Sequence, residues 1–101
     1  MSKKTLKENA KVVEKTLHEN GFEHLHVSVM ADHIIIYSID GAEKVNRSRL
    51  SFITEEDKYQ LSMADHTGRW ESTPYTGTLD ELLTLLTNNF VFALTDFDNF
   101  R

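Results

Sequence analysis

The sequence has no cysteine, only one proline and only four glycines. The lack of cysteine excludes disulfides, thiolate nucleophiles and sulfur-ligated metals. Small secreted domains usually need disulfides, so we expect a cytoplasmic protein. No apolar run approaches the roughly 20 residues of a membrane-spanning helix, so no membrane partner is expected. With so few glycines, no phosphate-binding loop is present.

The composition is that of a globular protein, with 40% hydrophobic and 27% charged residues, and we expect one domain over residues 1–101. The net charge of −5 is uneven, because residues 1–20 carry +2 and the remaining chain therefore carries −7. Nucleic-acid binding rests on phosphate neutralisation by basic residues. A nucleic-acid partner is therefore not expected, and a stripe of lysines near the N-terminus is interpreted as a solvated helix face.

Two segments show helical periodicity. In the first, apolar residues recur at steps of three and four from Leu6 to Leu17, with a capping box at Thr5 and Glu8 and a stop at Asn20–Phe22. The second is predicted from 79 to about 88, after a capping box at Thr78 and Glu81. Two continuations stay open: the helix runs on to about 94, or it ends at Asn88-Asn89 and a short strand covers 90–94.

The middle of the chain predicts strands. A turn at Ala31-Asp32 pairs Val29 with Ile34 and Val27 with Ile36, and residues 41–46 are expected to form a loop. The next hairpin has two possible registers. A three-residue loop over 55–57 places Phe52 opposite Gln60, whereas a four-residue loop over 55–58 places it opposite Leu61. We prefer the four-residue loop, because a one-residue slip moves side chains to the wrong face.

These elements predict an α+β fold: an N-terminal helix, an antiparallel meander of about five strands, and a C-terminal helix, with both helices on one face of the sheet. A turn at residues 65–68 brings Trp70 opposite Met63 and so places it on the helix-covered face. That face is expected to carry Leu25, Val27, Val29, Ile34, Ile36, Leu50, Phe52, Leu61, Met63 and Trp70.

The opposite face of the predicted sheet is not cleanly polar. A sheet with one solvated face should alternate between hydrophobic and polar residues, yet here an apolar centre is surrounded by Tyr, His and Arg, which is the composition of an interface. Either this face binds a partner, or segment 90–97 or loop 41–47 covers it. The candidate binding residues are His24, His26, Ile35, Tyr37, Ile39, Arg49, Ile53 and Arg69.

Catalytic and metal signatures are weak. His24 and His26 supply half of a zinc site, but no Asp, Glu or Cys lies across from them in the predicted register, and His33 lies about 13 Å along the strand. No Gly-x-Ser-x-Gly elbow occurs. We therefore expect no metal, no cofactor and no catalytic residue.

The order of helix, antiparallel sheet and helix, together with the acidic charge, resembles the layout of bacterial secretion chaperones. The resemblance extends to no residue-level motif, so it implies no site residue.

The leading hypothesis is a small non-enzymatic protein-binding module, of a bacterial or mobile-element accessory, immunity or inhibitor kind. It would bind a partner protein or a second copy through the open sheet face. An alternative is a small-ligand binder or enzyme that uses His24, His26, Arg49 and Arg69, which requires a concave pocket. A secretion-chaperone-like protein is a further alternative.

Overall fold

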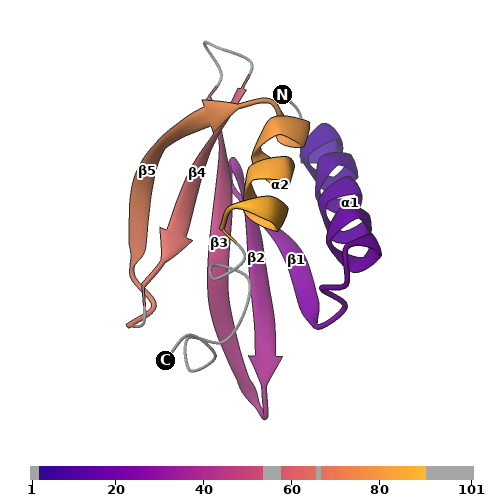
Figure 1. Ribbon diagram of the computed structural model, residues 1–101, viewed down its shortest axis with the longest axis vertical. Helices are drawn as coiled ribbons and strands as arrows, with labels where there is room; N and C mark the ends of the chain where they lie inside the picture. The colour runs from indigo at the N-terminus through magenta and orange to yellow at the C-terminus, as the bar shows by residue number, and fades with distance from the viewer. Residues whose placement is uncertain (1–2, 54–57, 66, 91–101) are drawn as a thin grey trace.

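The computed structural model describes residues 3–53, 58–65 and 67–90, and it confirms the α+β fold (Figure 1). Helix α1 precedes five strands and helix α2 follows them. The sheet is an antiparallel meander in the order β1-β2-β3-β4-β5. The bounds of the elements are α1 Lys3–Glu19, β1 Leu25–Met30, β2 His33–Asp40, β3 Glu43–Ile53, β4 Lys58–Ala64, β5 Trp70–Gly77 and α2 Leu79–Asn88.

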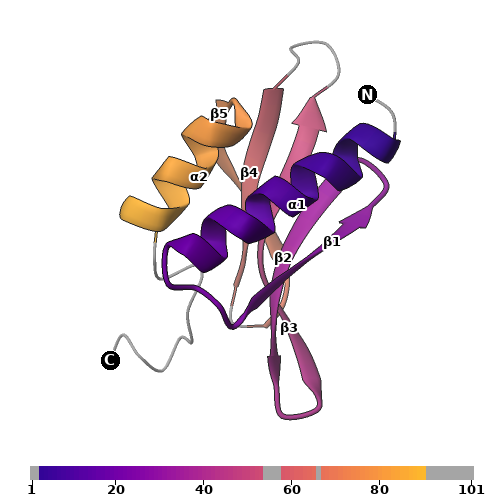
Figure 2. The ribbon, with the colours of Figure 1, turned by 90° about the vertical axis from the view of Figure 1, so that its right-hand side faces the viewer.

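Both helices lie on one face of the sheet, as predicted (Figure 2). The apolar stripe of α1 is buried there against strand residues and against three leucines of α2. Neither of the two described helices is long and apolar enough to cross a membrane. The buried core on this side consists of Leu6, Ala10, Val13, Leu17, Leu25, Ile34, Ile36, Leu50, Tyr59, Leu61, Leu82, Leu83 and Leu86.

Helix α1 ends in a Schellman motif, as the Asn-Gly-Phe sequence predicts. The N–H of Phe22 donates to the carbonyl of Leu17 at 2.9 Å, and the N–H of Gly21 donates to that of His18 at 3.1 Å. Gly21 has φ of +93°, a conformation that side chains disfavour. At the other end, the helix begins by Lys3, so the predicted capping box at Thr5 is wrong and Thr5 lies inside the helix.

The first hairpin has the predicted register, with Val27 opposite Ile36 and Val29 opposite Ile34. Ala31 takes the positive φ of +53° that its two-residue turn requires. The predicted loop over 41–46 is wrong, because β3 begins at Glu43. The β2–β3 register shifts between Ile36 and Tyr37, which makes Arg47 the extra residue of a β-bulge.

Arg47 is 4% exposed, an unusual burial for a charged side chain. Its Nε donates to the Ser38 hydroxyl at 3.0 Å, and its Nη2 lies 3.5 Å from an Asp40 carboxylate oxygen. The bulge therefore directs the Arg47 guanidinium toward Ser38 and Asp40, near the C-terminal end of β2.

The predicted register of the β3–β4 hairpin is wrong by two residues. Phe52 pairs with Tyr59 rather than Leu61, and Leu50 pairs with Leu61 rather than Met63. A shift of two residues keeps every side chain on its predicted face, because successive strand residues alternate. The apolar pattern specified the face of each residue but did not distinguish between registers two residues apart.

The β4–β5 register differs from the prediction by one residue, and this changes the face. Trp70 pairs with Ala64, and Met63 pairs with Glu71. Trp70 therefore lies on the side away from the helices, and its predicted place on the helix-covered face is wrong. Glu71 pairs with Met63 and therefore lies on the side of the helices, where its side chain is exposed.

Helix α2 begins and ends as predicted. Thr78 and Glu81 form a reciprocal capping box, with bonds of 3.2 Å and 2.9 Å to each other's backbone N–H. The helix ends at Asn88, so the alternative in which it continues to 94 is wrong. Phe90 follows and packs against the core. Residues 91–97, and with them the first predicted cover of the open face, lie outside the described residues. The second predicted cover, a loop over 41–47, is wrong because β3 begins at Glu43 and pairs with β2.

Replacing Thr78 by alanine removes the side-chain acceptor of the capping box. We expect Thr78→Ala to lower the free energy of unfolding by about 1 kcal/mol, measured by urea denaturation. Thr84→Ala, at an exposed position inside α2, is the matched control and should cause no loss. An equal effect of both changes would show that the cap contributes nothing.

Candidate functional site

The open face is the side of the sheet that points away from the two helices. Ile34 and Ile36 belong to the helix-side core, so the alternating residues of β2 point to the opposite side. Ile35 and Ala64 are buried, yet neither belongs to that core. By register, the open face carries His26, Ser28, Met30, His33, Ile35, Tyr37, Ile39, Lys44, Asn46, Arg49, Ser51, Ile53, Lys58, Gln60, Ser62, Ala64, Trp70, Ser72 and Thr76.

Arg49 and Trp70 cover the middle of the open face. The Arg49 guanidinium carbon lies 4.9 Å from the centre of the Trp70 ring, although Arg49 is on β3 and Trp70 is on β5. To reach that ring, the Arg49 side chain crosses β4, where its direct pair is Ser62. Ser62 is accordingly only 1% exposed. A cation–π pair therefore covers this part of the sheet.

A second cluster surrounds Tyr37. The His26 ring centre lies 5.5 Å from the Tyr37 ring centre, and the Lys44 amine lies 4.3 Å from it. Two apolar residues of the open face are largely exposed, Met30 at 63% and Ile39 at 49%. Aromatic, basic and exposed apolar side chains thus lie on the same face of the sheet.

Two buried polar atoms next to this surface lack hydrogen-bond partners within the described residues, Asn46 Oδ1 and Arg49 Nε. Both belong to β3, where Asn46 pairs with Tyr37 and Arg49 pairs with Ile35. Most buried polar groups in native proteins are hydrogen-bonded, so unsatisfied ones require an explanation. Here the guanidinium is held by its ring contact rather than by an acceptor for Nε.

His33 and Ser51 form a polar pair at one end of the face, with His33 Nδ1 2.8 Å from the Ser51 hydroxyl. Burial lowers the pKa of His33 below 6.5, the Arg49 charge lowers it further, and Asp32 partly offsets this. The environment therefore favours the neutral imidazole.

The structure brings together six of the eight predicted binding residues. His26, Ile35, Tyr37, Ile39, Arg49 and Ile53 share the open face by register. His24 precedes β1, and its ring lies 6.4 Å from Phe22. Arg69 lies before β5 in a turn, where its N–H donates to the Asp65 carboxylate at 3.0 Å. Both residues precede a strand, so the sheet register does not assign them to the open face.

Sequence reasoning missed Trp70 and Lys44 as members of the open face, and Met30 as its most exposed apolar residue. Lys44 falls within the predicted loop over 41–46, and the one-residue difference in the β4–β5 register moves Trp70 to this face. The turn at 65–69 held the missing signal: Asp65 accepts bonds from the N–H groups of Thr67 and Arg69. Such an Asx-type turn extends the loop before β5 begins.

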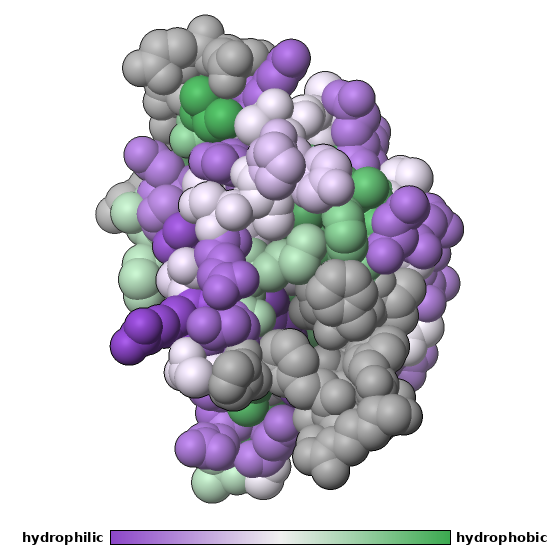
Figure 3. Space-filling model, turned by 60° about the vertical axis from the view of Figure 1, so that its left-hand side comes forward, coloured by the Kyte–Doolittle hydropathy of each residue, from purple (hydrophilic) through white to green (hydrophobic). Residues whose placement is uncertain are grey.

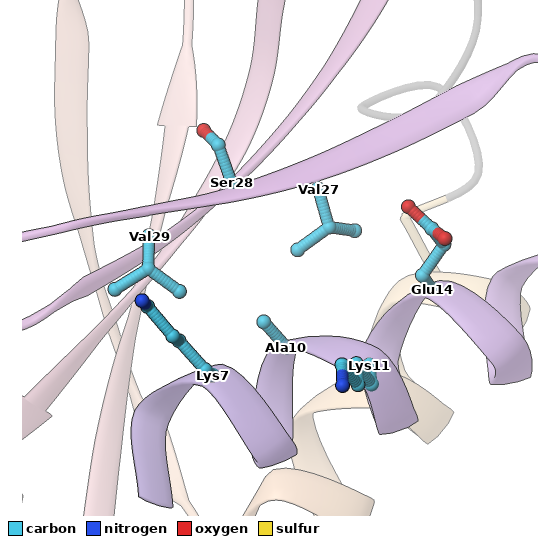
Figure 4. A pocket seen from close by; sticks show the side chains of 7 residues that line it. All are labelled: Lys7, Ala10, Lys11, Glu14, Val27, Ser28 and Val29. Carbon is cyan, nitrogen blue, oxygen red and sulfur yellow. The ribbon is translucent and has the colours of Figure 1, made fainter. Parts of the chain in front are cut away.

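No group of three or more His, Asp and Glu side chains in the described ranges is placed to hold a metal. A pocket of about 290 Å³ lies between α1 and β1, and none of His24, His26, Arg49 and Arg69 lines it (Figure 4). Figure 3 shows the side of the molecule that carries β5, where hydrophilic residues surround small apolar areas.

Comparison with protein-family models, with curated proteins and with solved structures finds no match to this chain.

Because the pKa of His33 is lower in the folded chain, the unfolded chain binds a proton at this site more readily. We expect the free energy of unfolding to fall as the pH drops below 6.5, until the folded form is also protonated. His33→Gln should reduce this slope in urea denaturation between pH 5 and 7.5. The same slope in both proteins would contradict the assignment.

Truncating the Arg49 side chain removes the group that covers Ser62 and contacts Trp70 on the open face. We expect Arg49→Ala to destabilise the fold by roughly 0.5–2 kcal/mol and to shift Trp70 fluorescence to longer wavelength, because the indole loses its stacked partner. Trp70 is the only tryptophan, so the emission reports this site alone. Arg69→Ala removes an equal charge from the adjacent turn and should leave the emission unchanged.

Proposed function

We propose that this chain is a non-enzymatic protein-binding module that takes a partner protein on the open face of its sheet. The observation that carries the proposal is the combination of exposed Met30 and Ile39 with the Tyr37 and Trp70 clusters on one side of the molecule. The biological role that we propose with it is that of a bacterial or mobile-element accessory, immunity or inhibitor protein.

The chemistry of the open face supports a protein partner. Tyr, Trp, Met and Arg are enriched at protein interfaces, and the most important contact residues are Trp, Tyr and Arg. Trp70 and Arg49 are already stacked on each other, so a partner would meet an ordered surface at a small entropic cost. The exposed ends of the face, at Met30 and Ile39, add apolar area that binding would remove from water.

The alternative of a small-ligand binder or enzyme requires His24, His26, Arg49 and Arg69 to converge on a pocket. None of these residues lines the pocket between α1 and β1, and His24 and Arg69 lie outside the strands. The secretion-chaperone alternative rests on layout alone. We therefore keep protein binding as the proposed function.

The test immobilises the wild type, an open-face double variant and a control variant. The proteins that each one captures from a lysate of its source cells are then quantified and compared. Met30→Asp with Ile39→Asp places charges on the open face at positions that are already exposed. Val12→Glu is the matched control, because Val12 is 46% exposed and lies on α1. We expect the double variant to lose a partner that the wild type and the control both retain.

Sedimentation of the same three proteins tests self-association as the form of binding. If neither partner capture nor solution mass differs between the double variant and Val12→Glu, the open face is not a binding surface. Circular dichroism of each protein establishes that the fold is intact before the comparison.

A further inference from the structure

The two edges of the sheet differ in how they are protected against further strand pairing. The outer strand at the edge of a sheet has unpaired backbone N–H and C=O groups. Proteins usually prevent these groups from pairing with another strand by means of proline, bulges or charges at the edge. The β5 edge carries Pro74, and the β4–β5 register is irregular between Gln60 and Ser62. The β1 edge has an unbroken register with β2 and no proline or charged Lys, Arg, Asp or Glu within Leu25–Met30.

The phase of the hairpin shows which β1 groups point outward. Met30 and His33 flank a two-residue turn, so they form a hydrogen-bonded pair. Hydrogen-bonded and non-hydrogen-bonded pairs alternate along an antiparallel ladder, so Ser28 and Ile35 form the next hydrogen-bonded pair. The N–H and C=O groups of Leu25, Val27 and Val29 therefore point away from β2. Leu25 confirms this phase, because its N–H donates to Phe22 O at 3.2 Å and its O lies 2.9 Å from His18 Nε2.

Within the described part of the chain, Val27 and Val29 have no such partners. Among residues 3–53, 58–65 and 67–90, no backbone hydrogen bond occupies their outward groups. His18 and Phe22 thus satisfy the start of the β1 edge and leave its middle available. Two N–H and two C=O groups lie along this stretch with the spacing of an antiparallel ladder.

The pocket between α1 and β1 opens along this same stretch. Val27 and Val29 point toward the helix, whereas Ser28 points away (Figure 4). Ala10 lies at the base of the pocket, and Lys7 extends from α1 toward the strand. Its volume of about 290 Å³ is just below the range of small-molecule sites, about 300–1,000 Å³, and suits one or two side chains.

The rim of the pocket is basic. Lys7 and Lys11 are exposed and form no ion pair with the described part of the chain, whereas Glu14 is the single acidic lining residue. This charge is opposite to the net charge of −5 of the whole chain. An incoming acidic residue would therefore be attracted here and repelled by much of the remaining surface.

We infer that the β1 edge binds an extended segment of a partner protein as a sixth, antiparallel strand. The segment pairs with the outward groups of Val27 and Val29, places an apolar side chain against Ala10, and places a carboxylate near Lys7 or Lys11. Backbone pairing supplies affinity, and the pocket and its charges supply selectivity, as in other cases of strand addition. This surface is separate from the open face.

The test titrates the ¹⁵N-labelled full chain with an acetylated hexapeptide of alternating valine and threonine that carries an aspartate at each end. We expect the Val27 and Val29 amides to shift and to gain protection from hydrogen exchange. Lys11→Glu should weaken binding about tenfold, the equivalent of about 1.4 kcal/mol. Lys15→Glu, an exposed position on the same helix, is the matched control and should bind like the wild type.

Three further arms can overturn the inference. A peptide methylated on alternate amides should not bind, and equal binding would exclude strand pairing. Hexanoate alone should not reproduce the shifts, and reproducing them would make the pocket a small-carboxylate site. Protected Val27 and Val29 amides without peptide, together with a dimeric solution mass, would assign the edge to a second copy.

Ile39→Asp should bind the peptide normally, so failure here is distinguishable from failure at the open face.

Discussion

The packing of two helices against one face of the sheet is the constraint on which the rest of the structure depends. Leu6, Val13 and Leu17 of α1 and Leu82 and Leu86 of α2 are almost fully buried on that side. Burial of this apolar area is the main favourable term for a chain of this size. Among residues 3–53, 58–65 and 67–90, no helix packs on the second face, so its own side chains shield the backbone from water there.

The open face meets this requirement with side chains that lie flat across the strands. Arg49 spans from β3 to the Trp70 ring on β5, and Lys44 lies over Tyr37. Such side chains cover apolar surface with their stems while keeping charge at the surface. The result is an ordered, partly apolar surface, which also accounts for its suitability as a binding site.

Much of the fold follows from sequence patterns that operate over short distances. The Schellman end at Gly21, the capping box at Thr78 and the Ala31-Asp32 turn each depend on a few neighbouring residues, and each was predicted correctly. The predicted β3–β4 register is wrong, because a shift of two residues preserves the alternation of faces. The apolar residues pair well in both the predicted and the observed register. Trp70 was placed on the wrong face because the turn at Asp65 is one residue longer than its glycine suggested. The bulge at Arg47 depends on long-range burial of a cation, for which the local sequence gives no signal.

The central feature of the structure is that two helices cover one face of the sheet, whereas the other face lies open among the described residues. Hydroxyl-radical footprinting of the free protein, read by mass spectrometry, measures this side chain by side chain. We expect rapid labelling of Met30 and Ile39 and slow labelling of Ile36 and Leu61 on the helix side. Labelling of Met30 and Ile39 as slow as that of Leu61 would show that the open face is covered and would contradict the account.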